Sequence, residues 1–126
     1  MKMVSYFVTA ALATAGLSAA AQAHTKLVSA TPAANSTAAK PTGLQLHFSG
    51  RLIPKLSHVD LFMVGMAGHA HAPMKVGGVA TSFPADGKTI IVKLAQPLSV
   101  GTYRVDYRGV SSDTHKAQGS YTFNVK

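Results

Sequence analysis

The chain has 126 residues, of which 47% are hydrophobic and 13% are charged, and it carries a formal net charge of +8. It contains no cysteine, so disulfide bonds, thiolate metal ligands and cysteine nucleophiles are excluded. The lysines and arginines are scattered singly rather than in runs. We therefore interpret the positive charge as favouring solubility and predict no nucleic-acid partner.

Residues 1–23 have the pattern of a cleaved secretory signal peptide. Lys2 precedes an apolar run that ends at Leu17, and the segment closes on Ala-Gln-Ala at residue 23. The apolar run is shorter than the roughly 20 residues that a membrane-spanning helix needs, although a retained N-terminal anchor is the alternative. Cleavage after Ala23 would make His24 the first residue of a single exported domain, residues 24–126.

Short alternating segments, separated by Gly, Pro, Asn, Ser or Asp, predict β-strands along the rest of the chain. Apolar side chains recur at every second position in most of these segments, so one face of each strand would pack in a core. Strands are expected near 27–29 and 79–83, and in LQLHF (44–48), HVDLFMV (58–64), TIIVKLA (89–95), TYRVDYRGV (102–110) and SYTFNV (120–125). About seven strands predict an all-β fold, a small antiparallel sandwich or Greek-key barrel.

Residues 63–74, MVGMAGHAHAPM, depart from this pattern and are predicted to form an irregular loop. The segment contains three methionines, Met63, Met66 and Met74, and two histidines, His69 and His71. Thioether sulfur selects Cu(I) over hard cations, and imidazole also binds copper. The pattern therefore predicts a soft-metal site. The alternative is that the methionines fill gaps in the core, which suits Met63 best.

His24 would carry a free α-amine after cleavage, so its amine and its imidazole could bind one metal ion together. Nitrogen donors in a square-planar arrangement favour Cu(II), and the ion must displace the proton of the amine. Asp113 and His115 are spaced i, i+2, which on an extended segment places both side chains on one side. They either contribute to a metal site, with Asp113 binding or orienting His115, or form a turn in which Asp113 caps the backbone. His47 and His58 lack such neighbours and are interpreted as ordinary strand or loop residues.

Five segments together resemble the CopC-type family of periplasmic copper-binding proteins. They are H-x-K-L at the expected N-terminus, LHFS at 46–49, the Met/His segment, GTYRVDYRGVSSDTH at 101–115 and the final YTFNVK. The resemblance covers nearly all of residues 24–126. It implies a Greek-key β-barrel related to cupredoxin-like and immunoglobulin-like sandwiches. It also implies a role in copper resistance or homeostasis, carrying or sequestering periplasmic copper ions beside a CopD-like membrane copper transporter or other periplasmic copper proteins.

The same resemblance implies two metal sites. The Cu(II) site falls on His24, Asp113 and His115, and the Cu(I) site on Met63, Met66, His71 and Met74. Two positions depart from the family pattern. Gly50 stands where the family often has a glutamate near Cu(II), so we expect weaker Cu(II) binding. His69 stands where a family methionine is found, so whether His69 or His71 binds Cu(I) is open.

These residues predict a binding protein rather than an enzyme, because the sequence offers no candidate pair of nucleophile and base. A copper-dependent oxidative enzyme that uses an N-terminal histidine chelate is the alternative. Secreted polysaccharide monooxygenases of that kind usually present an aromatic substrate surface, and this chain has no tryptophan. A third alternative is an interaction module whose histidines and methionines are incidental.

Overall fold

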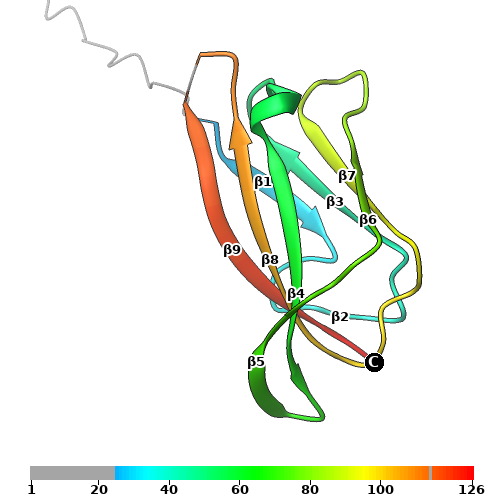
Figure 1. Cartoon of the computed structure of the whole chain (residues 1–126). Helices are drawn as coiled ribbons and strands as arrows, with labels where there is room; N and C mark the ends of the chain where they lie inside the picture. The colour runs from blue at the N-terminus through cyan, green and yellow to red at the C-terminus, as the bar shows by residue number, and fades with distance from the viewer. Residues whose placement is uncertain (1–24, 114) are drawn as a thin grey trace, which may run out of the picture.

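Nine β-strands and one short 3-10 helix make up the part of the chain that the computed structural model describes, residues 25–113 and 115–126 (Figure 1). The strands are β1 (Leu27–Thr31), β2 (Thr37–Ala38), β3 (Gly43–Phe48), β4 (His58–Met66), β5 (His69–Lys75), β6 (Val79–Ser82), β7 (Thr89–Leu94), β8 (Gly101–Val110) and β9 (Lys116–Val125), and the helix η1 spans Pro54–Leu56. Within these residues, no helix is long and apolar enough to span a membrane.

The strands form two sheets that face each other. The first sheet has the strand order β1-β3-β7-β6, and the second has the order β2-β9-β8-β4-β5. Every pairing is antiparallel except that of β2 with β9, which is parallel. The sheets remain separate layers, so of the two predicted architectures the structure is a sandwich rather than a closed barrel. The all-β prediction is confirmed.

The core lies between the sheets and is built from the residues that the alternation predicts. The most deeply buried side chains are Tyr103, Phe123, Leu44, Leu46, Leu61, Ile90, Val92 and Val105. The rings of Tyr103 and Phe123 stack with centroids 5.7 Å apart, and the Tyr103 hydroxyl donates to the Ser99 carbonyl at 2.8 Å. Burying a large apolar side chain of this kind contributes about 1.5–3 kcal/mol. Met63, Tyr107 and Tyr121 are only partly buried and pack against this core.

Two strands were not expected from the sequence. The two-residue β2 is too short to show alternation. The second, β5, lies within residues 63–74, so the prediction of an irregular loop there is wrong. β4 instead continues to Met66, and β5 returns beside it as the edge strand of the second sheet.

The long strand β8 separates two ends of the sandwich that matter for function. One end holds the turn between β8 and β9, which contains Asp113 and His115. At the other end the β4–β5 hairpin projects beyond the sheets (Figure 1). β8 has ten residues, so at about 3.3 Å per residue the two ends are roughly 30 Å apart.

Candidate metal-binding sites

The Asp113 carboxylate holds the His115 ring in the β8–β9 turn. Asp113 Oδ2 lies 2.9 Å from His115 Nδ1, and Asp113 Oδ1 accepts a hydrogen bond from the His115 backbone N–H at 3.1 Å. The buried Ser111 hydroxyl also donates to Asp113 Oδ1. The segment is therefore a turn in which Asp113 caps the backbone, and the carboxylate orients the imidazole at the same time.

These hydrogen bonds keep Asp113 ionised and place a proton on His115 Nδ1. The Ser111 hydroxyl, followed by the side chain and backbone N–H of His115, lowers the pKa of Asp113 well below its usual range. Asp113 is therefore an anion at neutral pH and can only accept hydrogen bonds. His115 Nδ1, which lies beside it, must then be the donor and carries a proton. The remaining ring lone pair is on Nε2, which makes Nε2 the atom that can bind a metal ion.

The start of the described chain lies against the same end of the sandwich. The backbone N–H of Lys26 donates to Ser49 Oγ at 3.0 Å, and the Ser49 N–H donates to the Lys26 carbonyl at 2.9 Å. Thr25 is only 4% exposed. A Cβ added at Gly50 would overlap Thr25 Oγ1 and lie 3.6 Å from Ser111 Cβ. The expected signal peptide and His24 lie outside the described residues, but Thr25, which follows His24, packs beside the residue that hydrogen-bonds Asp113.

Gly50→Ala is expected to lower the free energy of unfolding by about 1–3 kcal/mol, the usual cost of added volume in a packed site. The reason is that the new Cβ overlaps Thr25 Oγ1. Adding Thr25→Ala to the same chain removes that oxygen and should recover most of the loss. Urea denaturation of all four proteins in the cycle measures the coupling. Additive effects of the two substitutions would contradict the contact.

The Met/His segment closes as a hairpin because residues 67 and 68 adopt the backbone angles of a tight turn. Ala67 and Gly68 have positive φ angles of 51° and 78°, and a two-residue hairpin turn of type I′ needs positive φ at both positions. The small side chains on both strands do not prevent pairing, since the hydrogen bonds between strands are made by backbone N–H and C=O groups. The Ala67-Gly68 dipeptide was the local signal that could have indicated this turn.

The register of the hairpin sets the face on which each donor lies. Met63 is directly opposite Met74, and Met66 is directly opposite His69. At Val64, β4 carries one extra residue relative to β8, since Met63 pairs with Tyr103 and Gly65 pairs with Thr102. Paired residues share a face, so Gly65 faces outward with Thr102, and Met66 returns to the inner face of Met63. His69, opposite Met66, and His71, two residues along β5, lie on that inner face with Met74.

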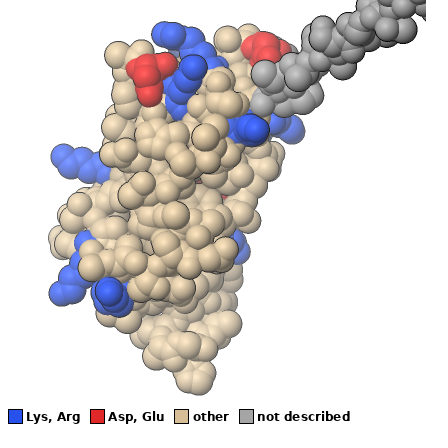
Figure 2. Space-filling model, turned by 180° about the vertical axis from the view of Figure 1, so that it is seen from behind, with Lys and Arg blue, Asp and Glu red and all other residues tan. Residues whose placement is uncertain are grey.

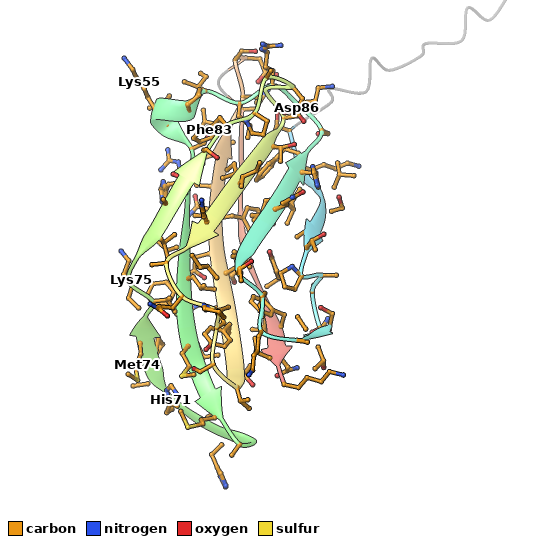
Figure 3. The ribbon with its side chains drawn as sticks, turned by 90° about the vertical axis from the view of Figure 1, so that its right-hand side faces the viewer. Lys55, His71, Met74, Lys75, Phe83 and Asp86 are labelled. Carbon is orange, nitrogen blue, oxygen red and sulfur yellow. The ribbon has the colours of Figure 1, made fainter. Side chains whose placement is uncertain are left out.

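Met63 and Met74 line a pocket beside the core. Met63 packs against the buried cluster, and Met74 is 61% exposed. The open pocket measures about 280 Å³ and is also lined by the segment from Ala95 to Ser99 and by Tyr103. Two methionine side chains thus border one open pocket at the base of the hairpin. Figure 3 shows Met74 and His71 on β5, beside and below the sandwich.

The two histidines of the hairpin differ in their contacts. His71 Nδ1 lies 2.8 Å from the carbonyl oxygen of Ala72, which is only an acceptor, so Nδ1 carries the proton and Nε2 carries the lone pair. His69 is exposed and follows the turn directly. No charged residue occurs between Met63 and Met74, and the lower tip of the molecule is correspondingly free of charge in Figure 2.

The two remaining histidines belong to other parts of the fold. His47 Nδ1 lies 3.0 Å from Thr89 Oγ1, whose hydroxyl donates to Asp86. His58 is exposed at the start of β4. Within residues 25–113 and 115–126, no three His, Asp or Glu side chains gather closely enough to hold a metal ion. A metal site in this chain therefore needs methionine sulfur, a pair of histidines, or a residue outside the described range.

Comparison with known proteins finds relatives along almost the whole chain. Residues 27–126 match the family model described as the CopC domain. The chain is 50% identical over 120 residues to copper resistance protein C of Pseudomonas syringae pv. tomato, covering 95% of this chain and 94% of that protein. It is 46% identical over 112 residues to copper resistance protein C of Escherichia coli, covering 88% of each.

Solved structures agree with this sequence similarity. The crystal structure of PcoC from Escherichia coli, described as a methionine-rich copper resistance protein, matches with a TM-score of 0.74 and 46% identity, covering 82% of this chain and all of that chain. CopC from Methylosinus trichosporium OB3b matches with a TM-score of 0.65 and 28% identity, covering 82% of this chain and 94% of that one.

Proposed function

Because the chain belongs to the CopC family, we propose that it binds copper in the periplasm and contributes to copper resistance by carrying or sequestering the metal. The relatives that carry the name copper resistance protein C support this function. So does the arrangement of donors, since two regions with different donor types lie at opposite ends of one rigid sandwich. We assign Cu(II) to the nitrogen-rich end and Cu(I) to the sulfur-rich hairpin.

The proposed Cu(II) site combines the α-amine and imidazole of His24 with His115. In support, the ionised Asp113 carboxylate orients the His115 ring through Nδ1, which leaves Nε2 as the metal-binding atom. Asp113 then acts mainly by positioning His115. Consecutive Cα atoms are about 3.8 Å apart, so Thr25 beside Gly50 brings the chain close to this turn. Gly50 supplies no carboxylate, and we expect weaker Cu(II) binding than in relatives with glutamate there.

The proposed Cu(I) site lies in the β4–β5 hairpin, with Met63, Met66, His71 and Met74 as the donors. The observation that carries it is that Met63 and Met74 lie opposite each other and line one pocket. Met66 and His71 lie on the same face toward the tip of the hairpin, so their side chains must bend back toward the pocket to join that pair. Methionine has three rotatable bonds and tolerates such rearrangement. His71 rather than His69 is assigned, because the Ala72 carbonyl fixes its proton on Nδ1.

Separate sites for the two oxidation states suit a carrier. A carrier has to release copper as well as bind it, and an exposed hairpin is accessible to a partner. We propose a CopD-like membrane copper transporter or another periplasmic copper protein as that partner. No observation favours the alternative of a copper-dependent oxidative enzyme, so we do not propose one.

Copper is expected to raise the melting temperature of the folded protein. A ligand that binds only the folded state stabilises it by about 2.7 kcal/mol at 100 times its Kd. Thermal unfolding should be followed with Cu(II) in air and with Cu(I) under anaerobic conditions, and Mg²⁺ serves as the control ion. A melting temperature that neither form of copper changes would support the incidental interaction module instead.

A further inference from the structure

His69 and His71 are two residues apart on an exposed edge strand. Side chains alternate along a strand, so both lie on one face of β5, and Met66 lies opposite His69 on that face. Two residues of an extended strand span about 6.6 Å, since each rises by about 3.3 Å. Two imidazole side chains projecting from this spacing on one face can converge on a single ion.

The ring of His71 is already arranged for binding. Its Nδ1 donates to the Ala72 carbonyl at 2.8 Å, so the lone pair is on Nε2, at the outer end of the ring. A hydrogen bond of this kind fixes the tautomer and orientation of a histidine ligand and raises its basicity. The structure thus supplies the contact that commonly supports a metal-binding imidazole.

The surroundings leave room for an ion. The residues next to these histidines, Gly68, Ala70 and Ala72, have small side chains or none. β5 is the edge strand of the described sheet, so no further strand covers it. The nearest cation along β5 is Lys75, whose ammonium is held 3.4 Å from Asp60 Oδ1 on β4. That ion pair draws the positive charge toward β4 and away from His71.

We propose that His69 and His71 form a two-histidine chelate for a divalent first-row ion, Cu(II) or Zn(II), on β5 of the β4–β5 hairpin. The inference rests on the proposed function in that the same hairpin is assigned there to Cu(I). It extends that function, because the hairpin then holds copper in either oxidation state. Imidazole nitrogen suits the divalent ion, water fills its remaining positions, and the thioethers suit Cu(I).

Zn(II) is the probe that tests this chelate, because it is redox-inert and diamagnetic. Ring resonances of His69 and His71 are followed by NMR in residues 24–126 while Zn(II) is added, which resolves the hairpin from the N-terminal site. Both rings should respond with one shared midpoint. In His69→Met, the His71 midpoint should move to a concentration higher by at least about tenfold, since a chelate loses its second linked donor.

Methionine at position 69 keeps a soft donor, so Cu(I) affinity in His69→Met should stay within about twofold of that of the unchanged chain. His58→Met is the matched control, because it removes an exposed histidine of β4 outside the hairpin. It should leave the His71 midpoint unchanged.

Three results overturn the chelate: no Zn(II) response at either ring, separate midpoints for the two rings, or an unchanged His71 midpoint in His69→Met. If any one of these results is found while Cu(I) still binds, the proposed function stands without this inference. A shared Zn(II) midpoint in a protein that fails to bind Cu(I) would instead support the chelate and reject the proposed Cu(I) site.

Discussion

An extra methionine in front of His24 is expected to weaken Cu(II) binding by on the order of 100-fold, or about 2.7 kcal/mol. The extension turns the α-amine of His24 into an amide, which is no longer a basic donor. Asp113 and His115 cannot compensate, because the described residues offer no third carboxylate or imidazole beside them. Competition with a Cu(II) chelator at pH 7 measures the change between the chain that starts at His24 and the extended chain.

Two controls make that result specific. His47→Ala removes a histidine that hydrogen-bonds to Thr89, and it should leave Cu(II) affinity unchanged. Cu(I) affinity should also be the same with and without the extra methionine, because the hairpin lies at the other end of β8. Equal Cu(II) affinity in the two chains would mean that His24 is only a linker residue.

Replacing Met66 and Met74 together with leucine is expected to weaken Cu(I) binding by about 100-fold or more, because only Met63 then offers the sulfur that selects this ion. The two side chains are 52% and 61% exposed, and leucine is similar in volume, so the fold should be unaffected. Affinity is measured under anaerobic conditions by competition with a Cu(I) chelator.

Val100→Leu is the matched control for the double replacement. Val100 is 56% exposed and lies outside the hairpin, so the change alters a similar apolar surface without touching a donor. It should leave Cu(I) affinity unchanged. If the double variant binds Cu(I) as tightly as the unchanged chain, the sulfur donors are incidental and the proposed Cu(I) site is wrong.

The sandwich core could be predicted because its signal is local. Leu44, Leu46 and Phe48 alternate with polar residues, and Ile90, Val92 and Leu94 likewise occupy every second position. Period-two alternation follows from the geometry of a strand with one buried face, so it needs no knowledge of the partner strands. All six of these side chains are buried.

The hairpin could not be predicted in the same way. Neither strand of its projecting tip has a buried face, so residues 66–72 show no apolar alternation, and the only local signal was Ala67-Gly68 as a turn. Its register depends on extra residues in β4 and β5 just after Met63 and Met74 separate, which come from backbone pairing rather than from side-chain pattern. The face on which each donor lies was therefore visible only in the structure.

At the other candidate site, Asp113 and His115 do lie together, but in the capped turn that was the alternative prediction rather than on an extended segment. The roles of Ser111 and Thr25 were not predicted, because they depend on contacts between residues far apart in sequence. Ser111 donates to Asp113 from a buried position, and Thr25 occupies the space that a side chain at Gly50 would need. Glycine at position 50 thus leaves room for the Thr25 side chain, besides supplying no carboxylate for a metal ion.

Native mass spectrometry of the protein recovered after export would decide whether one folded chain holds copper at two separate sites. One equivalent each of Cu(II) and Cu(I) is supplied under anaerobic conditions. We predict a mass that begins at His24, with two copper ions bound to the same molecule. A chain that retains residues 1–23, or one that holds a single copper because Cu(I) displaces Cu(II), would contradict the two-site proposal.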